Sequence, residues 1–355
     1  MIAASFCLTN MKVIFLGAGA WGTAMAMHAS KNAHNLDVGL WSRSALLAKQ
    51  IQETRLNQKY LKDISLPDSL NVTDDWQGIF AKAQDQDLVV IATPVSGLKE
   101  TVHALLALNN CPKNWVWLCK GLEPETSLMP HQVIERELKV SQSLNKGIRL
   151  AVLSGPSFAS EVAIGMPCAL TVASDSQELV ALVQQVFHYG NMRIYGSSDI
   201  VGVELGGAIK NVLAIATGIG DGLGLGLNAR AALLTRGLSE MTRLITAMGG
   251  QPETAMGLTG VGDLILTATG DLSRNRQVGL QLASGKKLSE VLSSLGHVAE
   301  GVRCAQAVND LAIAKNIDMP ITQMVCQVLF SNLDLPSAVR LLMGRDPKSE
   351  NHSSN

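Results

Sequence analysis

Lys210 is the residue whose type and surroundings point most directly to chemistry, because it lies within the almost wholly apolar segment 202–218. The segment contains a single lysine and, next to it, a single amide, Asn211, and its pattern predicts one long buried helix. The residues on the lysine's face of that helix are all small: Gly206, Gly207, Ala214 and Thr217. We therefore expect the ammonium to face space. A buried ammonium is costly unless paired or reactive, so a proton-transfer role and a lysine that reaches the surface or closes a salt bridge both remain open.

Two short polar connections follow this segment. In the first, Gly260–Asp263, a carboxylate stands at the start of the apolar run Leu264–Thr267. The second, Ser273–Arg276, places guanidinium, hydroxyl and amide donors within four residues. Such a cluster suits a dianionic phosphate, because arginine offers a bidentate fork while serine and asparagine add neutral donors. The alternative is an ordinary polar turn.

A glycine motif near the N-terminus points to a dinucleotide. The β-branched run Met11–Leu16 leads directly into Gly17-Ala18-Gly19-Ala20-Trp21-Gly22, and a helix-like stretch, Thr23–Ser30, follows. In this strand–turn–helix context Gly17 allows a tight turn, Gly19 lets a pyrophosphate approach, and Gly22 lets the helix pack on the strand. The pyrophosphate would then lie at the amide-rich start of the helix.

Three further positions suit a ligand at the same edge of the sheet. Arg43 follows the strand Asp37–Trp41, where an NAD-selective site carries an acidic residue, so it could accept the 2′-phosphate of NADPH or be an ordinary surface arginine. Lys120 follows the strand Trp115–Cys119 and could point toward the ligand or be solvated. The small-residue turn Ser154–Ala159 offers amides and two hydroxyls to an anion or a carboxamide, or is a plain turn.

The elements that must position these residues predict two domains. An α/β, Rossmann-like doubly wound sheet is expected over 11–198, an all-α domain over 199–345, and a disordered tail over 346–355. The remaining strands are predicted at Asp87–Thr93, Arg149–Leu153, Cys168–Ala173 and Met192–Tyr195, with helices at Ala45–Arg55 and Gln177–His188 and a polar loop at Asn57–Asn71. The later helices are predicted at Ile200–Gly218, Ala229–Met248, Gln277–Ser284, Leu288–Leu295, Gly301–Lys315 and Pro320–Ser331.

Composition excludes several classes of function. The 355 residues are 47% apolar and 17% charged, with a net charge of −1. The sequence therefore lacks the excess of charge that attracts a protein to nucleic acid or to a membrane surface. The apolar run Leu205–Gly220 is short, glycine-rich and interrupted, so we expect no membrane insertion. The six cysteines show neither a C-x-x-C pair nor metal-ligand spacing, which favours a reduced, cytoplasmic protein without a metal.

Taken together, these segments resemble the bacterial NAD(P)-dependent glycerol-3-phosphate dehydrogenases. The likeness extends from about residue 11 to residue 340, and the most specific part is KN in the long helix with GVGD and SRN downstream. The motifs that carry it are GAGAWGTA (17–24), KGLE (120–123), LSGPSFASEVA (153–163), GVELGGAIKNVLAIATG (202–218), LNARAALLTRGLSEM (227–241), GLTGVGDLILT (257–267), SRNR (273–276) and AEG (299–301).

The resemblance implies reversible reduction of dihydroxyacetone phosphate to sn-glycerol 3-phosphate by NADPH or NADH, feeding glycerophospholipid synthesis. It implies that Lys210 is the catalytic acid–base group and that Asp263 pairs with it and tunes its proton affinity. The implied substrate contacts are Lys120, Gly155, Ser157, Lys210, Asp263, Ser273, Arg274 and Asn275. The implied cofactor contacts are Gly17, Gly19, Ala20, Trp21, Gly22, Arg43, Lys120, Ala159, Arg274, Val298 and Glu300.

The chain departs from the family pattern at three places outside the implied chemistry. Cys119 stands where a small serine or threonine is expected, Ala299 replaces a valine, and the loop after Tyr60 lacks the usual Pro-Gly. The departure after Tyr60 leaves that loop's contact with the cofactor open.

Two other functions fit parts of the pattern. A two-domain dehydrogenase of β-hydroxyacids or acyl-CoA would share the glycine motif and the later helices, but the Ser273–Arg276 cluster disfavours it. A redox sensor that binds NADPH would need no proton donor such as Lys210. The apolar helices of the second domain make a homodimer the expected assembly.

Overall fold

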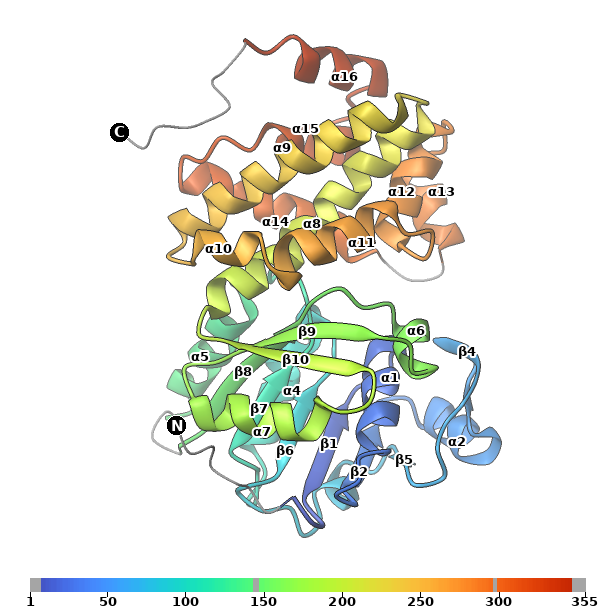
Figure 1. Cartoon of the computed structure of the whole chain (residues 1–355), viewed down its shortest axis with the longest axis vertical. Coiled ribbons are helices and arrows are strands. Elements are labelled where there is room, and N and C mark those ends of the chain that lie inside the picture. The colour runs from blue at the N-terminus through green and yellow to red at the C-terminus, as the bar shows by residue number, and fades with distance from the viewer. Residues whose placement is uncertain (1–7, 143–146, 296–298, 347–355) are drawn as a thin grey trace.

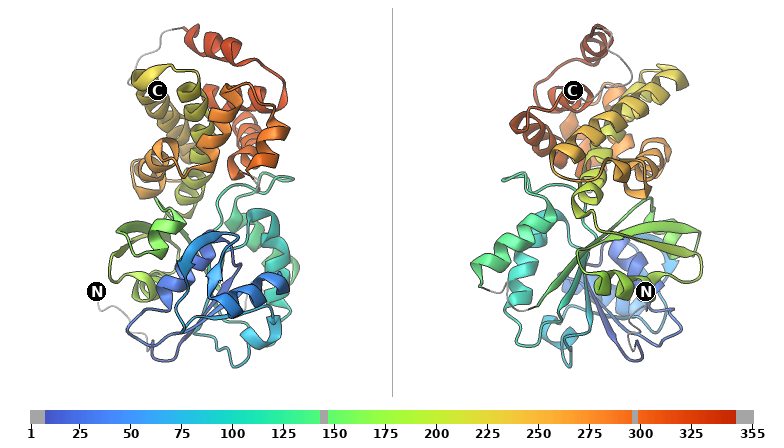
Figure 2. Two further views of the ribbon diagram at one scale, coloured as in Figure 1. Left: turned by 90° about the vertical axis from the view of Figure 1, so that its right-hand side faces the viewer. Right: turned by 60° about the vertical axis from the view of Figure 1, so that its left-hand side comes forward.

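The main sheet and its flanking helices form one end of the molecule, and a second group of helices forms the other (Figures 1 and 2). The computed structural model describes residues 8–142, 147–295 and 299–346. The sheet has the strand order β10-β9-β8-β7-β6-β1-β2-β5, and all its neighbours are parallel except β8 and β9. The strands are β1 Lys12–Leu16, β2 Asp37–Trp41, β5 Asn71–Thr73, β6 Leu88–Ile91, β7 Asn114–Trp117, β8 Arg149–Ser154, β9 Cys168–Ala173 and β10 Met192–Ser197.

Strand β1 marks the point where the strand order reverses. It pairs with β2 on one side and with β6 on the other, so that Leu16 lies beside Trp41 and Ile91. In doubly wound sheets ligands bind beyond the carboxyl ends of the strands at such a point. The chain leaves β1 there through Gly17, as the sequence predicts.

Helices cover both faces of the sheet because the strands are apolar on both sides. Val13 and Phe15 pack into one hydrophobic cluster with α1 and α7, and Ile14 and Leu16 pack into another with α4 and α5. The predicted doubly wound α/β arrangement is therefore confirmed. The helices of this part are α1 Ala20–Ala29, α2 Ala45–Thr54, α3 Trp76–Ile79, η1 Val95–Gly97, α4 Leu98–Leu106, α5 Pro130–Val140, α6 Ala159–Ala163 and α7 Gln177–Phe187.

The prediction of one polar loop over Asn57–Asn71 is wrong. Strands β3 (Leu56–Asn57) and β4 (Leu61–Ser65) form a two-stranded antiparallel sheet, and β5 joins the edge of the main sheet. Most of β4 is exposed, so its polar residues give no alternating apolar signal. The structure of this segment is decided by backbone hydrogen bonds between strands, which amino-acid composition does not reveal.

Every described element from Ile200 onward is a helix, which confirms the predicted all-helical second part. Helix α8 lies at its centre and is buried along nearly its whole length. The helices of this part are α8 Ile200–Gly222, α9 Gly226–Ala247, α10 Pro252–Ala255, η3 Leu258–Gly262, α11 Asp263–Thr269, α12 Arg274–Ala283, α13 Leu288–Ser294, α14 Glu300–Ala314, α15 Pro320–Phe330 and α16 Leu335–Met343. The predicted tail, 346–355, lies outside the described residues apart from its first residue.

Burial accounts for the apolar composition of α8. By length and hydropathy the helix could cross a membrane, but 83% of its most apolar window is enclosed by the rest of the protein. Its first turns reach toward the sheet while the remainder runs through the helical part (Figure 1). It is therefore the core helix around which the other helices pack.

Candidate active site

Two lysines from different parts of the chain meet at one buried carboxylate. The Lys210 ammonium, on α8, donates to Asp263 Oδ1 at 3.0 Å and to Thr267 Oγ1 at 2.8 Å. The Lys120 ammonium, three residues beyond β7, donates to Asp263 Oδ2 at 2.6 Å and to the Gly155 carbonyl at 3.1 Å. Asp263 is 1% exposed and begins α11. The sheet-containing part and the helical part thus each contribute a cation to the same group.

The electrostatics of this cluster favour a lysine that titrates near neutral pH. Burial lowers the pKa of Lys210 to about 8, opposed by the charge of Asp263 and assisted by the like charge of Lys120. Burial alone would raise the pKa of the Asp263 carboxyl, but the two ammonium groups outweigh it and hold that pKa below its usual range. The carboxylate therefore stays ionised while Lys210 is poised to exchange its proton.

The small residues around Lys210 let neighbouring segments pack closely against α8. The expectation that the ammonium faces open space is therefore wrong. A Cβ added to Gly206 would lie 2.6 Å from the Thr259 carbonyl oxygen, in the turn that leads to Asp263. A Cβ added to Gly207 would lie 3.4 Å from Lys120 Cγ. Gly206 lets the turn that leads to Asp263 approach α8, while Gly207 packs beside the stem of Lys120. The sequence pattern alone does not distinguish this packing from a vacant face.

Gly206→Ala should destabilise the protein, whereas its neighbour Gly207→Ala should not. Alanine in a helix interior gains about 1 kcal/mol over glycine. At Gly206 the backbone overlap with Thr259 reverses that gain, and we expect a net loss of about 1–3 kcal/mol. At Gly207 the new Cβ meets the flexible lysine stem at an ordinary contact distance. Thermal unfolding of both variants checks the prediction, and equal melting temperatures would contradict it.

The glycine turn after β1 has the shape that a dinucleotide needs. Gly17 has φ +123°, and a Cβ there would lie 2.9 Å from the Ala92 carbonyl carbon. A Cβ at Gly22 would lie 2.2 Å from the Gly17 oxygen, whereas nothing lies within 4 Å of a Cβ at Gly19. Gly19 also precedes α1 without a capping side chain, so this open approach faces helix amides. The residues present therefore fit the pyrophosphate of a dinucleotide.

The other predicted cofactor residues lie around this turn or near Lys210. Ala20 begins α1, and Trp21 and Ala159 pack partly buried against the hydrophobic cluster of that helix. Trp21 Nε1 is buried and has no hydrogen-bond partner within the described part of the chain. The exposed Arg43 follows β2 by two residues.

Glu300, at the start of α14, is exposed, and its charge contributes a small upward shift to the pKa of Lys210. Val298 lies outside the described residues.

The turn after β8 is tied to the lysine cluster through one carbonyl group. The Gly155 oxygen accepts from Lys120 and, at 3.1 Å, from Ser157 Oγ. Gly155 has φ +141°, which glycine alone adopts readily. Ser154 Oγ is buried and has no partner among the described side chains and backbone groups. Of the two predicted hydroxyls, that of Ser157 is used within the turn, and that of Ser154 is enclosed beside Gly207 of α8.

The Ser273–Arg276 cluster is the first turn of α12 and divides into structural and available groups. Ser273 caps the helix by accepting from the Arg276 amide. Asn275 donates to Asn211 Oδ1 at 2.8 Å and accepts from the Gly301 amide at 3.0 Å. Arg276 pairs with Asp221 at 2.9 Å. Arg274 is exposed, and no hydrogen bond or ion pair holds its side chain in the described structure.

That Ser273, Arg274 and Asn275 act together on a ligand stays a prediction, and the structure adds that two of them also hold helices in place. Ser273 caps α12, and Asn275 joins α12 to α8 and α14. A sequence cannot reveal these roles, because residues that fix helices and residues that bind ligands have the same chemistry. Arg274 precedes Asn275. The side-chain amide of Asn275 bonds to Asn211, which follows Lys210 in α8. Arg274 is the member of the cluster that is free to hold a phosphate.

Two buried residues support the site without having been predicted. Thr267, one turn after Asp263, accepts from Lys210 and donates to Asp263 Oδ1 at 3.2 Å. Asn57 donates to the Ala18 carbonyl at 3.0 Å and to Thr23 Oγ1 at 2.9 Å, which fixes the glycine turn to α1. The i to i+4 spacing of Asp263 and Thr267 on one helix could have indicated the first. The second depends on a long-range contact and carries no local signal.

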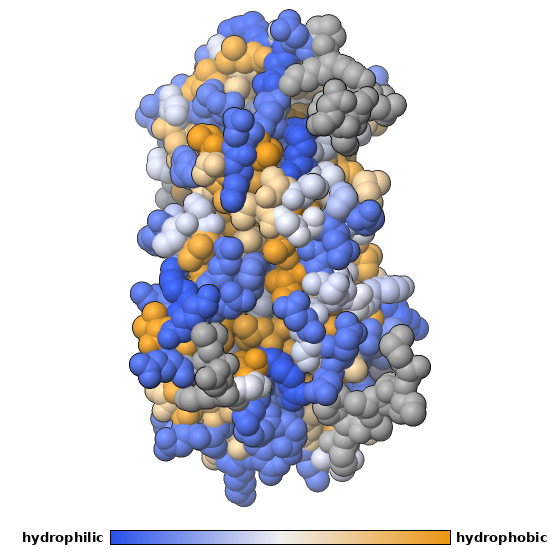
Figure 3. Space-filling model, turned by 90° about the vertical axis from the view of Figure 1, so that its left-hand side faces the viewer, coloured by the Kyte–Doolittle hydropathy of each residue, from blue (hydrophilic) through white to orange (hydrophobic). Residues whose placement is uncertain are grey.

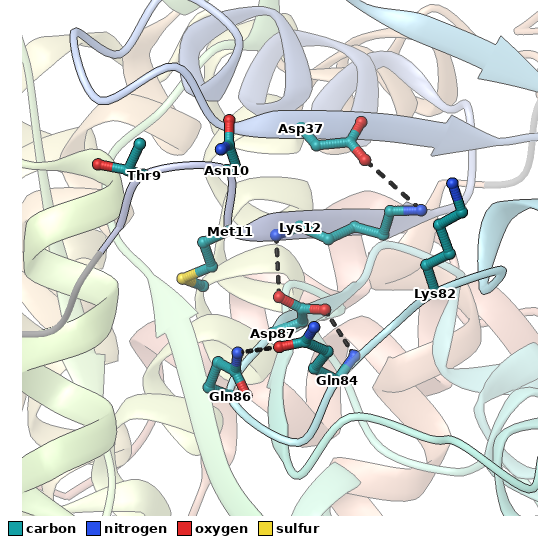
Figure 4. A pocket seen from close by; sticks show the side chains of 9 residues that line it. All are labelled: Thr9, Asn10, Met11, Lys12, Asp37, Lys82, Gln84, Gln86 and Asp87. Carbon is teal, nitrogen blue, oxygen red and sulfur yellow. Dashed lines mark hydrogen bonds and ion pairs between the residues drawn. The ribbon is translucent and has the colours of Figure 1, made fainter.

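A polar hollow of about 360 Å³ lies elsewhere, at the amino ends of the strands (Figure 4). Its lining residues already serve one another: the Lys12 amide donates to Asp87 Oδ1 at 2.9 Å, and the Lys12 ammonium lies 3.5 Å from Asp37. This is the edge of the sheet opposite to the glycine turn, so the hollow does not belong to the site. Within the described residues no three His, Cys, Asp or Glu side chains gather as metal ligands.

Comparisons with known proteins agree over nearly the whole chain. Family profiles described as the N-terminus and the C-terminus of NAD-dependent glycerol-3-phosphate dehydrogenase match residues 12–180 and 199–340. Proteins named glycerol-3-phosphate dehydrogenase (NAD(P)+) from Polynucleobacter necessarius and Cupriavidus necator are 61% and 56% identical to this chain. Each alignment spans 342 residues, 96% of this chain and 100% of the relative.

A solved structure shows the same arrangement. The crystal structure of glycerol-3-phosphate dehydrogenase from Coxiella burnetii superposes with a TM-score of 0.87 at 37% identity, over 95% of this chain and 99% of that one. Fold, sequence and the two matched profiles agree from the glycine turn to α16. The chain therefore belongs to the NAD-dependent glycerol-3-phosphate dehydrogenase family of oxidoreductases.

Proposed function

We propose that this protein reduces dihydroxyacetone phosphate to sn-glycerol 3-phosphate with NADPH or NADH, reversibly, and that Lys210 is its acid–base group. The observation that carries the proposal is the buried Lys210–Asp263–Lys120 cluster, formed between the nucleotide-binding sheet and the helical part. The relatives named above are glycerol-3-phosphate dehydrogenases, and belonging to their family argues against a hydroxyacid dehydrogenase and against a non-enzymatic redox sensor.

The residues of the cluster would act on the oxygen of the ketone. A dinucleotide held at the glycine turn would supply the hydride when bound. As the carbonyl carbon is reduced, negative charge builds on its oxygen, and the Lys210 ammonium donates a proton to it. Asp263 holds Lys210 in place through Oδ1 and Lys120 through Oδ2, so both cations stay oriented without solvent reorganisation. In the reverse direction neutral Lys210 would accept the proton of the alcohol.

The substrate phosphate would be held on the helical side. Arg274 offers two parallel N–H donors to a phosphate, and Arg276 and Asn275 fix the first helical turn that carries it. On the sheet side, Lys120 and the turn that contains Gly155 and Ser157 would contact the carbon chain of the triose. Binding the phosphate remote from the reacting carbon uses its binding energy to orient the ketone.

The two directions of the reaction should depend on pH in opposite ways. Reduction needs protonated Lys210, whose pKa is about 8, so kcat/KM for ketone reduction should fall about tenfold per pH unit above that value. Oxidation needs the neutral amine and should rise through the same range. Substrate phosphate does not interfere, because its second ionisation lies near pH 6. Initial rates in both directions at constant ionic strength test this, and parallel profiles would contradict it.

The function itself is tested by adding dihydroxyacetone phosphate to purified protein with NADPH and, in parallel, with NADH. We expect oxidation of the nicotinamide with an equal amount of sn-glycerol 3-phosphate formed. Unphosphorylated dihydroxyacetone is the control, and it should react far more slowly because it lacks the group that Arg274 holds. No oxidation with either cofactor would overturn the proposal. The exposed Arg43 permits NADPH without requiring it, so the ratio of the two rates measures the preference.

We further propose a cytoplasmic homodimer that supplies glycerophospholipid synthesis. Several large apolar side chains are exposed on the helical part, such as Leu227 on α9 and Met343 on α16. On the face in Figure 3, hydrophobic residues lie in small groups separated by polar ones. The mass of the protein in solution, measured by light scattering, decides: twice the mass of one chain supports the dimer, and a single chain's mass would exclude it.

A further inference from the structure

Glu204 is a second buried carboxylate on α8, six residues before Lys210, and the proposed chemistry does not use it. It is 4% exposed and accepts from three donors in the sheet-containing part. Trp117 Nε1, in the last residue of β7, donates to Oε1 at 2.9 Å, and so does the His131 amide in the first turn of α5, also at 2.9 Å. His131 Nδ1 bonds to Oε2. One carboxylate therefore joins α8 to both a strand end and a helix start.

Trp117, one of the partners of Glu204, belongs to the same short segment as Lys120. Trp117 is fully buried and lies three residues before Lys120. The chain from Trp117 to Leu122 packs on both sides of the junction, since Cys119 belongs to a core cluster of the sheet and Leu122 belongs to the core of the helical part. Val203, beside Glu204, enters the cluster of the sheet. The segments that carry the two lysines thus meet twice: at Asp263 through their ammonium groups, and at Glu204 through its carboxylate and the indole of Trp117.

Burying the Glu204 carboxylate costs a large free energy of desolvation, which its hydrogen bonds must offset. Burial raises the pKa of Glu204, and the hydrogen bonds and charge of His131 oppose that rise. A hydrophobic residue of similar size would fill the position without that cost. A buried polar group that specifies one arrangement of neighbouring elements is the best-attested reason to keep such an interaction.

We propose that Glu204 is a positioning residue that sets the register of α8 against β7 and so fixes Lys210 and Lys120 on the two oxygens of Asp263. The inference rests on the proposed function, because its main readout is turnover of dihydroxyacetone phosphate. Glu204 touches neither lysine; it acts through Trp117 and through the helix that it shares with Lys210.

The test compares three variants. Glu204→Leu removes all three bonds, and Glu204→Gln keeps a carbonyl oxygen for Trp117 and the His131 amide. Glu240→Leu is the matched control: Glu240 is 1% exposed and also accepts three bonds, from Ile321 and Thr322 at the start of α15, away from both lysines. We expect Glu204→Leu to lower kcat by about tenfold or more with KM for NADPH unchanged, because misplaced catalytic groups affect the chemical step. Glu204→Gln should recover most of kcat, and Glu240→Leu should lose thermal stability but keep kcat.

Equal kcat in Glu204→Leu and Glu240→Leu would overturn the inference, as would a fall in kcat that Glu204→Gln fails to recover. If Glu204→Leu does not fold, Trp117→Phe removes the donor on β7 alone and should lower kcat with the same unchanged KM for NADPH; a wild-type kcat would contradict the proposal. Should the wild-type protein fail to reduce dihydroxyacetone phosphate, the proposed function fails but the positioning role is still decided by a crystal structure of Glu204→Leu. Two ammonium groups still bonded to Asp263 in that structure would overturn it.

Discussion

Lys210→Ala should abolish reduction of dihydroxyacetone phosphate while leaving the affinity for NADPH unchanged. The substitution removes both the proton donor and the cation next to the developing oxyanion, and together these effects correspond to a loss of about 10³-fold or more in kcat. The predicted contacts of the dinucleotide lie at the glycine turn and are untouched. Steady-state rates and titration of bound NADPH by its fluorescence measure the two quantities separately.

The protein should tolerate this change structurally because Asp263 keeps a partner. Lys120 Nζ still lies 2.6 Å from Asp263 Oδ2, so the buried carboxylate is not left without a counter-charge. Lys210→Met is the volume-matched control for the vacated space, and it should be as inactive as the alanine variant. Activity near that of the wild type in either variant would remove Lys210 from the mechanism. Loss of NADPH binding would show that the lysine acts on the cofactor instead.

Arg274→Ala should raise the KM for dihydroxyacetone phosphate by about 10–100-fold, because the substitution removes one or two charge-assisted hydrogen bonds to the phosphate. Its side chain holds no structural contact in the described part of the chain, so the melting temperature should stay close to that of the wild type. The family pattern places Arg274 among both the substrate contacts and the cofactor contacts. Measuring the affinity of the variant for NADPH therefore shows which of the two the substitution weakens. A large fall in NADPH affinity would assign the arginine to the nucleotide.

Arg276→Ala is the matched control on the same helical turn. Arg276 bonds Asp221 through Nε at 3.0 Å, and its side chain is 11% exposed, so its removal should lower thermal stability. Its effect on KM should be smaller than that of Arg274→Ala. An unchanged KM in Arg274→Ala, or the same rise in both variants, would mean that the phosphate is held elsewhere.

The sequence predicts the buried strands and the long helices, because these elements follow from the local pattern of apolar residues. The strands β1, β2 and β6 are short, mostly apolar runs, and the pattern predicts each within two residues of its observed bounds. The long helix around Lys210 was expected from its apolar run, and the structure extends it by four residues to Gly222. The hairpin of β3 and β4 escaped prediction, since its exposed polar residues carry no periodic signal.

The site was predictable in its residue types but not in its connections. Lys210 and Asp263 lie 53 residues apart, and only the family resemblance paired them before the structure brought them to 3.0 Å. That both lysines share one carboxylate, and that Ser273 and Asn275 fix helices, depends on three-dimensional packing. Residues that bind a ligand and residues that cap a helix are chemically alike, so sequence alone cannot divide them.

A single-turnover measurement of hydride transfer tests the central claim most directly. Enzyme saturated with NADPH, or with NADPH deuterated at the transferred position, is mixed rapidly with dihydroxyacetone phosphate, and the oxidation of the bound cofactor is followed in the wild type and in Lys210→Ala. The account predicts that the transfer step itself slows by about 10³-fold or more in the variant and shows a clear deuterium isotope effect. Hydride transfer at the wild-type rate in the variant would contradict it.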